Sequence, residues 1–522
     1  MKRFITISLF MVLVLPYAIT KKPKEKIPPR MKYKKTHYVR GRTTMVHLFE
    51  WKWKDIAAEC ERFLGPKGYG GVQVSPPNEN LMVRLQKRPW WERYQPISYR
   101  LITRSGNEKQ FANMVRRCNN VGVRIYVDAV VNHMAAQSDE YYGTGGSKVN
   151  FGDWVYPSVP YYSYNFNWPH CIISKEDYKC CPERVRNCQL DGLRDLNLGT
   201  EHVRDVLVKY LNHLIRLGVA GFRIDSAKHM WPFDLKIIYS RLHSLSTKHG
   251  FPSGARPFIY QEVIDFGGEA ISSDEYTAMG AVTEFRYGME VSRAFQRFNV
   301  LSWLHNLGTS WGFVPSHSAI TFIDNHDNQR GYCPGCNILT YKKPKNYIGA
   351  VAFMLAYSYG NPRIMSSFKF ENPDVGPPMD ENQRILSPSI KRDGSCGNGW
   401  VCEHRWPQIY SMVAFRKVAA NNRVNDWWDN GSNQIAFCRG AVAFVAFNND
   451  LIDFDETLQV CVPPGRYCDV ITGVIKRRNC TGKLVTVNKD GRARISIRAH
   501  AKDMVLAIHV GKQVSPCAVH VL

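Results

Sequence analysis

Three short apolar runs in this chain of 522 residues each lead into a carboxylate. GFRIDSAKHMW contains Asp225, PFIYQEVID contains Glu262, and AITFIDNHDNQR contains Asp327. Such runs are typical of buried strands, and charged side chains just after them lie where parallel-sheet enzymes keep their chemistry. A single aspartate in this position is often only a helix cap. Three runs built the same way favour a shared site.

Paired carboxyl groups suit one kind of reaction. Hydrolysis of a glycosidic bond needs one carboxyl group as acid and another, across the bond, as nucleophile or base. A third carboxylate would orient the substrate. Arg223 lies two residues before Asp225, so both side chains point to the same face of a strand, and the arginine charge would help to keep the aspartate ionised.

The stretches GFRIDSAKHMW, YQEVID and FIDNHDNQRG resemble the catalytic stretches of animal, chloride-dependent α-amylases, in glycoside hydrolase family 13. The resemblance runs from about Gly41 to near the C-terminus. It implies a secreted, endo-acting α-amylase that hydrolyses internal α-1,4 bonds of starch and glycogen with retention of configuration. It also implies that Asp225 is the nucleophile, Glu262 the general acid and base, and Asp327 the carboxylate that holds the distorted sugar.

The elements that must position these residues alternate between β-rich apolar runs and helix-like stretches. This alternation predicts an α/β fold with a parallel sheet and crossover helices. Eight such strands close a (β/α)8 TIM barrel, in which the strand C-termini converge on one face and would bring the three carboxylates together. The predicted strands are residues 44–51, 69–75, 124–131, 220–227, 257–264, 281–285, 319–327 and 363–368.

Two regions depart from the barrel pattern. Residues 133–196, after the third strand, are rich in Tyr, Gly, Pro, Asn and Cys and are too long for an ordinary connection, so they predict a loop-rich inserted domain. Residues 423–522 contain short β-rich runs broken by turn residues, which predict an antiparallel β-sandwich, of the Greek-key type by the resemblance. The barrel is then assigned to residues 44–132 and 197–422.

The beginning of the chain has two parts. Residues 1–18 have the basic start, apolar run and small final residue of a signal peptide, and no later apolar stretch is long enough to span a membrane. We therefore expect a secreted, extracellular protein. Residues 19–43 form a basic arm, in which residues 21–42 hold ten Lys/Arg and one Glu of a chain with formal charge +24. The arm is expected to be solvated.

The expected partners follow from these features. We expect a monomer that acts on starch or glycogen. A role of the arm in binding an anionic polysaccharide, a cell surface or nucleic acid stays open, although no nucleic-acid-binding fold accompanies it, so we expect no nucleic acid.

Fifteen cysteines in a secreted chain predict disulfides, and the odd number leaves at least one without an internal partner. The resemblance pairs Cys60 with Cys118, Cys171 with Cys188, Cys396 with Cys402, and Cys468 with Cys480. Asn430-Gly-Ser and Asn479-Cys-Thr are glycosylation sequons. Cys438 with Cys461 and Cys333 with Cys336 are candidate pairs among the cysteines beyond the family pattern, which are Cys180, Cys181, Cys333, Cys336, Cys438, Cys461 and Cys517.

The resemblance also implies one structural calcium ion. Ca²⁺ prefers oxygen ligands from carboxylates, amides and backbone carbonyls. The side chains of Asn132 and Asp195 and the backbone carbonyls of Arg186 and His229 match the calcium site of the family. A metal held there would join the insertion to the barrel, and the alternative for Asp195 is a helix cap.

One activating chloride ion is implied in the same way. Arg223, Asn325 and Arg363 match the anion site of the family, where two guanidinium groups supply fixed donors. Amylases that lack the second arginine tend to lose the chloride requirement. A salt bridge in the core is the competing explanation for Arg363.

RPWWERYQP supplies a row of aromatic side chains. Aromatic faces stack on pyranose rings while polar groups orient the hydroxyls, although a row of aromatics usually indicates core. Its position after the second strand favours sugar binding. The substrate-binding residues implied by the motifs and the resemblance are Trp90, Trp91, Tyr94, Gln95, His133, Lys228, His229, Ile264 and His326.

Three other functions stay open. The insertion is rewritten relative to the family, which would suit an amylase-related paralogue with an altered product range or weak activity. A non-catalytic, amylase-like binding protein predicts the loss of at least one catalytic carboxylate, and all three are present. A maltose-releasing α-glucosidase of the same barrel family would prefer small substrates to polymer.

Overall fold

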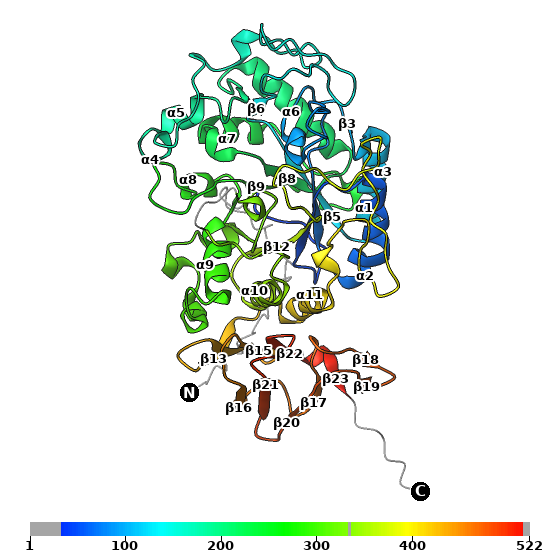
Figure 1. Ribbon diagram of the computed structural model, residues 1–522, viewed down its shortest axis with the longest axis vertical. Helices are drawn as coiled ribbons and strands as arrows, with labels where there is room; N and C mark the ends of the chain where they lie inside the picture. Colours follow the sequence, from blue (N-terminus) through cyan, green and yellow to red (C-terminus); the bar gives the residue numbers. More distant parts are fainter. Residues whose placement is uncertain (1–32, 332–335, 515–522) are drawn as a thin grey trace, which may run out of the picture.

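The computed structural model describes residues 33–331 and 336–514. Its centre is a closed barrel of eight parallel strands in the order β1-β2-β5-β8-β9-β10-β11-β12, with β12 pairing back onto β1 (Figure 1). The predicted barrel is confirmed, and each strand lies in or overlaps its predicted run. The strands are β1 Met45–Leu48, β2 Gly71–Val74, β5 Arg124–Ala129, β8 Gly221–Ile224, β9 Phe258–Gln261, β10 Ala281–Thr283, β11 Ala319–Thr321 and β12 Asn361–Ser366.

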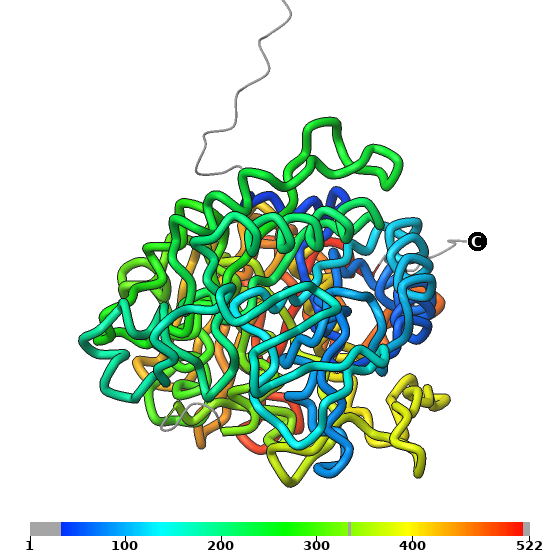
Figure 2. The backbone as a smooth tube through the Cα atoms, turned by 90° about the horizontal axis from the view of Figure 1, so that it is seen from above, coloured from blue at the N-terminus to red at the C-terminus, as the bar shows by residue number. Residues whose placement is uncertain are grey.

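The strands are mostly apolar and are buried throughout, because helices outside and side chains inside cover both of their faces. Most of the helices surround the barrel, as the view from above shows (Figure 2). One of them, α3, begins with a capping box in which Asn107 and Gln110 bond each other's backbone amides. The main helices are α1 Trp53–Glu59, α3 Glu108–Asn120, α6 Glu201–Arg216, α7 Pro232–Ser240, α9 Phe285–Phe295, α10 Pro344–Ala356 and α11 Pro407–Ala419.

The insertion between β5 and α6 lies over one end of the barrel (Figure 1). It holds the short helices α4 (Asp177–Cys180) and α5 (Pro182–Asn187). A two-stranded ribbon of β6 (His133–Met134) and β7 (Arg194–Asp195) ties its last residues to the end of the third barrel strand. The ribbon therefore carries the insertion on the same face as the strand C-termini.

The C-terminal region is all antiparallel β-structure at the other end of the barrel, as predicted (Figure 1). A four-stranded sheet and smaller sheets enclose a second core. Where α10 meets β14, the ring centroids of Phe353 and Phe437 lie 6.1 Å apart. The prediction did not include β16, because its sequence FDETLQ exposes four polar side chains. The strands are β13 Val424–Asp429, β14 Gln434–Arg439, β15 Ala443–Asn448, β16 Phe454–Gln459, β17 Gly465–Cys468, β18 Ile475–Lys476, β19 Asn479–Cys480, β20 Leu484–Val487, β21 Arg492–Ile497, β22 Val505–His509 and β23 Gln513–Val514.

The prediction of a solvated arm is wrong for residues 33–42. Lys34 Nζ donates to Ser318 Oγ at 2.6 Å, and the hydroxyl of Tyr126 donates to the carbonyl of Thr36. Tyr38 is partly buried against the core, and its ring packs edge-on against Tyr126. Aromatic side chains between the basic residues bury enough apolar surface to hold this part of the arm against the barrel. Residues 21–32 lie outside the described part of the chain.

The four disulfides implied by the resemblance are present, as is the candidate bridge Cys438–Cys461. Cys180 and Cys181, adjacent in sequence, also form a disulfide. The candidate pair of Cys333 with Cys336 is not tested, because Cys333 lies outside the described residues. Cys517 also lies outside them.

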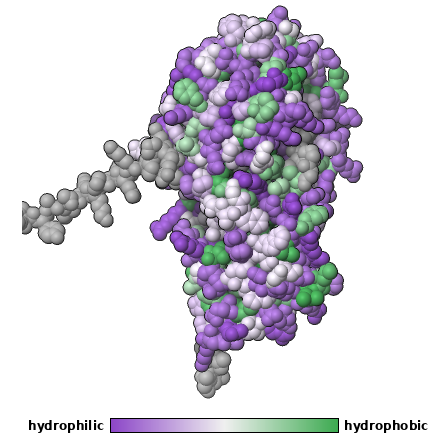
Figure 3. All heavy atoms as spheres, turned by 90° about the vertical axis from the view of Figure 1, so that its left-hand side faces the viewer, coloured by the Kyte–Doolittle hydropathy of each residue, from purple (hydrophilic) through white to green (hydrophobic). Residues whose placement is uncertain are grey.

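The visible side of the molecule is mainly hydrophilic, with small, scattered hydrophobic patches (Figure 3). Within residues 33–331 and 336–514, none of the helices combines the length and the apolar character needed to cross a membrane.

Candidate active site

The three predicted catalytic carboxylates meet in one cleft at the C-terminal end of the barrel. Asp225 follows β8 directly, Glu262 follows β9 directly, and Asp327 lies in the loop after β11. All three line a cavity of about 630 Å³. Residues scattered over about 100 positions in sequence are therefore neighbours because parallel strands end at one face.

Arg223 joins two of these carboxylates from beneath. Its Nη1 donates to Asp225 Oδ1 at 2.8 Å, and its Nη2 donates to Glu262 Oε1. The guanidinium group is buried, and Asp128 also accepts from Nη1, at 2.5 Å. One cation therefore fixes the orientation of three acidic groups.

Ser226 shapes the end of β8. It has a positive φ of 50°, which a residue with a side chain rarely adopts. In this conformation its amide donates to Glu262 Oε2 at 3.0 Å, and its hydroxyl donates to Asp225 Oδ2 at 3.1 Å. Backbone strain of this kind occurs at functional sites, and here it points both carboxyl groups into the cleft.

Asp225 and Asp195, for which a helix cap was the alternative, cap no helix. The short helical turn after β8 is capped by Ser226 and helix α7 by Trp231, so Asp225 caps no helix. Helix α6 is capped by Thr200, so Asp195 does not cap it. Both cap alternatives are therefore wrong.

Burial dominates the titration of the acidic groups. It raises the pKa of Asp225 to about 6, against the opposing effect of Arg223, and the pKa of Asp327 to about 8, with a further rise from the charge of Glu262. Burial therefore favours the protonated form of Asp327 more strongly than that of Asp225.

The histidines of the site are neutral at pH 7. Burial lowers the pKa of His133 to about 4 and holds that of His326 well below its usual value. His133 Nε2 lies 2.9 Å from the carbonyl of Tyr94, and the ring of His326 stacks on Tyr94 at 5.0 Å. Neutral imidazoles in fixed orientations suit hydrogen bonding to hydroxyl groups.

The structure places every predicted substrate-binding residue on the wall of the same cleft. The aromatic residues of RPWWERYQP are part of this wall, although Trp90 and Tyr94 are also largely buried. The predicted residues on the wall are Trp90, Trp91, Tyr94, Gln95, His133, Lys228, His229, Ile264 and His326.

The sequence reasoning missed three residues of the site. Asp128 is buried under the cleft, where it accepts from Arg223 and from the hydroxyl of Tyr94 at 2.9 Å. Glu269 lines the cleft and pairs with Lys228. The hydroxyl oxygen of Tyr178, from the insertion, lies 3.0 Å from His229 Nε2. The motif DAVVNH, which begins with Asp128, was the one available signal.

The predicted calcium ligands fit a cation. His133 pairs with Asp195 across the ribbon, which brings Asn132 beside the Asp195 carboxylate. Asn132 Oδ1 is buried without a hydrogen-bond partner among the described residues. Burial holds the pKa of Asp195 well above its usual value, although hydrogen bonds from Asn167 and Asn132 oppose this rise. Both observations indicate oxygen atoms that lack a cation.

The two predicted backbone ligands lie beside these side chains. Arg186 and His229 line one cavity of about 250 Å³. Asn167 lines the same cavity and donates to Asp195 Oδ2 at 2.6 Å. Two of the predicted ligands therefore line this cavity, and Asn167 links it to a third, Asp195.

Of the predicted chloride ligands, Arg363 could hold an anion, whereas Arg223 already donates to three carboxylates. Arg363 is buried with its guanidinium group over the ring of Phe322, and Nη1 donates to the neutral Gln73 at 2.8 Å. Among the described residues it forms no salt bridge, so the competing explanation of a core ion pair is wrong. Burial and the charge of Arg223 lower its pKa. A buried cation without a counter-ion suits an anion.

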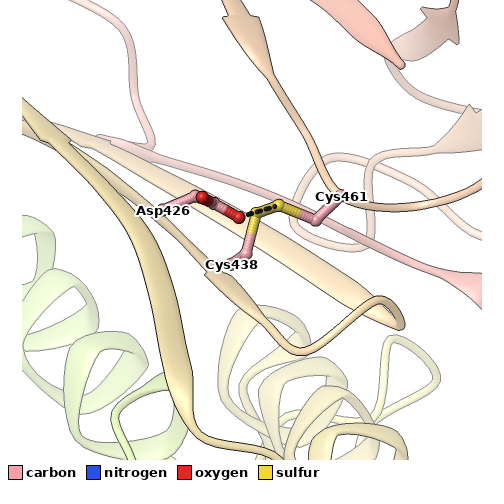
Figure 4. Close-up of side chains that lie close together, drawn as sticks. All are labelled: Asp426, Cys438 and Cys461. Carbon is pink, nitrogen blue, oxygen red and sulfur yellow. Dashed lines mark hydrogen bonds between the residues drawn. A yellow bond between two sulfur atoms is a disulfide. The ribbon is translucent and has the colours of Figure 1, made fainter. Parts of the chain in front are cut away.

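Another cluster has the spacing of metal ligands but not the chemistry. Asp426, Cys438 and Cys461 place one ligand atom each within 4.8 Å of the others. The two sulfur atoms form a disulfide bond (Figure 4). A disulfide offers no thiolate, so this cluster is a structural bridge with a neighbouring carboxylate.

Comparison with known families agrees with this geometry. Residues 86–365 match the catalytic domain of α-amylase, and residues 425–511 match the α-amylase C-terminal all-β domain. The chain therefore belongs to the α-amylase family. The closed barrel seen here agrees with the glycoside hydrolase fold of this family.

Individual relatives cover nearly the whole chain. The chain is 54% identical over 479 residues to an α-amylase-related protein of Drosophila atripex, and equally to that of Drosophila ananassae, covering 92% of this chain and 95% of each relative. α-Amylase I of the earthworm Eisenia fetida, solved as a mutant with maltohexaose and as wild type, superposes with a TM-score of 0.86. It is 43% identical over 91% of this chain and 98% of that one.

Proposed function

We propose that this protein is a secreted, endo-acting α-amylase that hydrolyses internal α-1,4 bonds of starch and glycogen. The observation that carries the proposal is the single cleft that holds Asp225, Glu262 and Asp327 together with all nine predicted sugar-binding residues. A non-catalytic binding protein would have no need for strained Ser226 to orient two carboxyl groups.

In the proposed reaction Asp225 attacks the anomeric carbon while Glu262 gives a proton to the leaving oxygen. A water molecule then attacks the glycosyl ester, and Glu262 takes up the proton of that water. Arg223 supports Asp225 as an ionised nucleophile because it donates to Oδ1. Asp327 and the neutral His133 and His326 would hold the hydroxyls of the distorted sugar.

The arrangement favours retention of configuration. Retaining enzymes hold their two carboxyl groups closer together than inverting enzymes, which need space for a water molecule. Here Asp225 and Glu262 bind the two terminal nitrogens of one guanidinium group. Carboxyl groups bridged in this way are close neighbours, as a nucleophile and an acid must be.

Two ions belong to the proposal. A calcium ion, held by Asn132, Asp195 and the carbonyls of Arg186 and His229, would stabilise the junction between insertion and barrel. A chloride ion, held by Arg223, Asn325 and Arg363, would supply a fixed negative charge beside the catalytic groups. We also propose a secreted, glycosylated monomer, in line with the disulfides and the two sequons.

A second candidate keeps the same chemistry but changes its outcome. The relatives from Drosophila carry the name α-amylase-related protein. An enzyme with an altered product range or weak activity would suit that name and the rewritten insertion.

The test is to incubate the secreted protein with soluble starch and to separate the products over time. An endo-acting amylase lowers the viscosity and iodine staining of starch before small sugars accumulate. Release of maltose alone from chain ends, or faster cleavage of maltose than of starch, would contradict the proposal. Polymer cleavage with an unusual set of products would favour the second candidate.

A further inference from the structure

One disulfide of the insertion joins two cysteines that are adjacent in sequence. Cys180 ends α4 and Cys181 precedes α5, so the bond lies at the junction of these two short helices. A disulfide stabilises a fold mainly by closing a long loop in the unfolded chain. The sequence separation here is 1, whereas that of Cys171 and Cys188, in the same insertion, is 17. The bond between Cys180 and Cys181 therefore adds little to stability through loop closure.

This disulfide is also accessible from solvent. Cys180 is exposed and Cys181 is half-buried. Among the disulfides within the described part of the chain, it is the one in which neither cysteine is buried. Exposed disulfides are the ones that a thiol can reach, and they include the labile and regulatory bonds of secreted proteins.

We infer that Cys180–Cys181 is a site of reversible thiol–disulfide exchange with a dithiol, and that its redox state controls how tightly the cleft binds sugar. Neither cysteine lines the cleft, so the control acts through the residues around them. The effect on sugar binding rests on the proposed function, whereas the exchange itself does not.

The exchange takes two steps. A thiolate of the dithiol attacks Sγ of Cys180, the more exposed cysteine, so a mixed disulfide forms and Cys181 leaves as a thiolate. The second thiolate of the dithiol then attacks the dithiol sulfur of that mixed disulfide, which closes the oxidised dithiol and releases Cys180 as a thiolate. Two electrons pass from the dithiol to the protein, and the two protons lost by the dithiol go to the cysteine thiolates. An oxidised dithiol reverses both steps.

Helix α4, on one side of the disulfide, reaches the cleft directly. The hydroxyl oxygen of Tyr178, two residues before Cys180, lies 3.0 Å from His229 Nε2. The ring centroid of Tyr178 lies 5.0 Å from Lys228 Nζ. All three of these side chains line the cleft. The backbone carbonyl of Tyr178 accepts from the amide of Ala270 at 2.9 Å, which ties α4 to the loop after β9.

Helix α5, on the other side, is anchored independently. Arg186 Nη2 donates to Glu275 Oε2 at 2.6 Å, and the guanidinium carbon lies 4.9 Å from the ring centroid of Trp231. The bridge between Cys171 and Cys188 fixes the end of the helix.

The closed disulfide therefore connects a short helix to an anchored one. Helix α4 has only four residues, and a helix of this length has little stability of its own. While the bond between Cys180 and Cys181 is closed, its small ring restricts the backbone at the junction. Reduction removes this restriction, so α4 gains freedom and the contact of Tyr178 with His229 weakens.

The first experiment locates the exchange. The native protein is treated with increasing concentrations of dithiothreitol, free thiols are alkylated, and the peptides are mapped by mass spectrometry. We expect Cys180 and Cys181 to be alkylated together at concentrations that leave Cys171 and Cys188 oxidised. Alkylation of Cys171 and Cys188 at the same or lower concentrations, or no alkylation of Cys180 before the protein unfolds, would overturn the inference.

The second experiment measures the effect on the cleft. Binding of maltoheptaose is followed by calorimetry in a Glu262→Gln background, which prevents hydrolysis during the titration. We expect reduction to weaken binding roughly three- to tenfold, the effect of one lost hydrogen bond. Equal affinity in the oxidised and reduced states would overturn the inference.

Two variants serve as controls in the same background. The double variant Cys180→Ser, Cys181→Ser cannot form the bond, so it should bind with the weaker affinity whether or not dithiothreitol is present. Tyr178→Phe lacks the hydroxyl that contacts His229 and should therefore lose the response to reduction while the cysteines still exchange. A full redox response in Tyr178→Phe would contradict the route through this side chain.

Failure of the proposed function would be recognised separately, because the parent protein would neither hydrolyse starch nor bind maltoheptaose. Amide hydrogen exchange then decides the inference. The amide of Ala270, which donates to Tyr178, should exchange roughly three- to tenfold faster after reduction. Unchanged exchange at Ala270 would overturn the inference.

Discussion

Nη1 of Arg223 lies 2.8 Å from Oδ1 of Asp225, two residues along the same strand end. The period-two alternation of a strand places both side chains on one face, and the fold buries the pair. Burial raises the pKa of Asp225, while the arginine opposes this rise. The pKa of Asp225 is therefore about 6, so its carboxyl group changes protonation state just below neutral pH.

We expect Asp225→Asn to abolish hydrolysis without unfolding the protein. The amide keeps the size of the side chain but is no nucleophile, so kcat should fall by roughly four orders of magnitude or more. The measurement is starch hydrolysis together with the melting temperature. Asp455→Asn makes the same change at an exposed aspartate on β16 and should retain full activity. Near-normal turnover of Asp225→Asn would refute the mechanism.

The pH dependence should reflect the buried aspartate. Asp225 must be ionised to attack, and its pKa is about 6. We expect kcat/KM to rise as the pH increases through about 6 and to be lower at more acidic pH. A profile that stays flat down to about pH 4, the region of an ordinary aspartate, would contradict this expectation.

Removal of calcium should lower the melting temperature. A metal that binds the folded protein but not the unfolded chain stabilises the fold by about 4 kcal/mol when present at a thousand times its dissociation constant. Asp195→Asn should weaken the response to chelator, whereas Asp205→Asn, an exposed change on α6, should leave it intact. An identical melt after chelation, with metal loss verified by elemental analysis, would argue against the ligands.

Chloride should activate the enzyme, and Arg363→Gln should reduce this activation. Gln removes the buried cation, while Arg363→Lys retains the charge and should keep part of the effect. The measurement is the pH–rate profile with chloride and with a larger, non-binding anion. Superimposable profiles of the parent under both conditions would eliminate the chloride site.

Glu403 should make the protein less stable at alkaline pH. Burial raises its pKa from 4.5 to about 7, so its contribution to stability is complete below about pH 4.5 and is lost as the pH rises through 7. We expect Glu403→Gln, which mimics the protonated form and can still accept from the amide of Ser367, to lose less stability than the parent between pH 5 and pH 8. Equal losses in parent and variant would show that Glu403 is not responsible.

The sequence by itself determined the barrel and most of the active site. Strands such as FIYQ and GFRI are mostly apolar and buried on both faces, a local pattern that survives in any compact fold. Motifs such as FIDNHD keep Asp327 and His326 in fixed order after β11. Predictions that depend on neighbours in sequence were therefore reliable.

Tertiary structure decided what depends on residues far apart in the chain. Whether Arg363 faces a carboxylate or a neutral amide is set by Gln73, which lies 290 positions away on another strand. The arm looked like a solvated segment because its charge is visible in the sequence, whereas the barrel surface that covers Tyr38 is not. The insertion also folds back onto the loop after β2, where Glu140 accepts from the amide of Arg84, and no local pattern in the sequence indicates that contact.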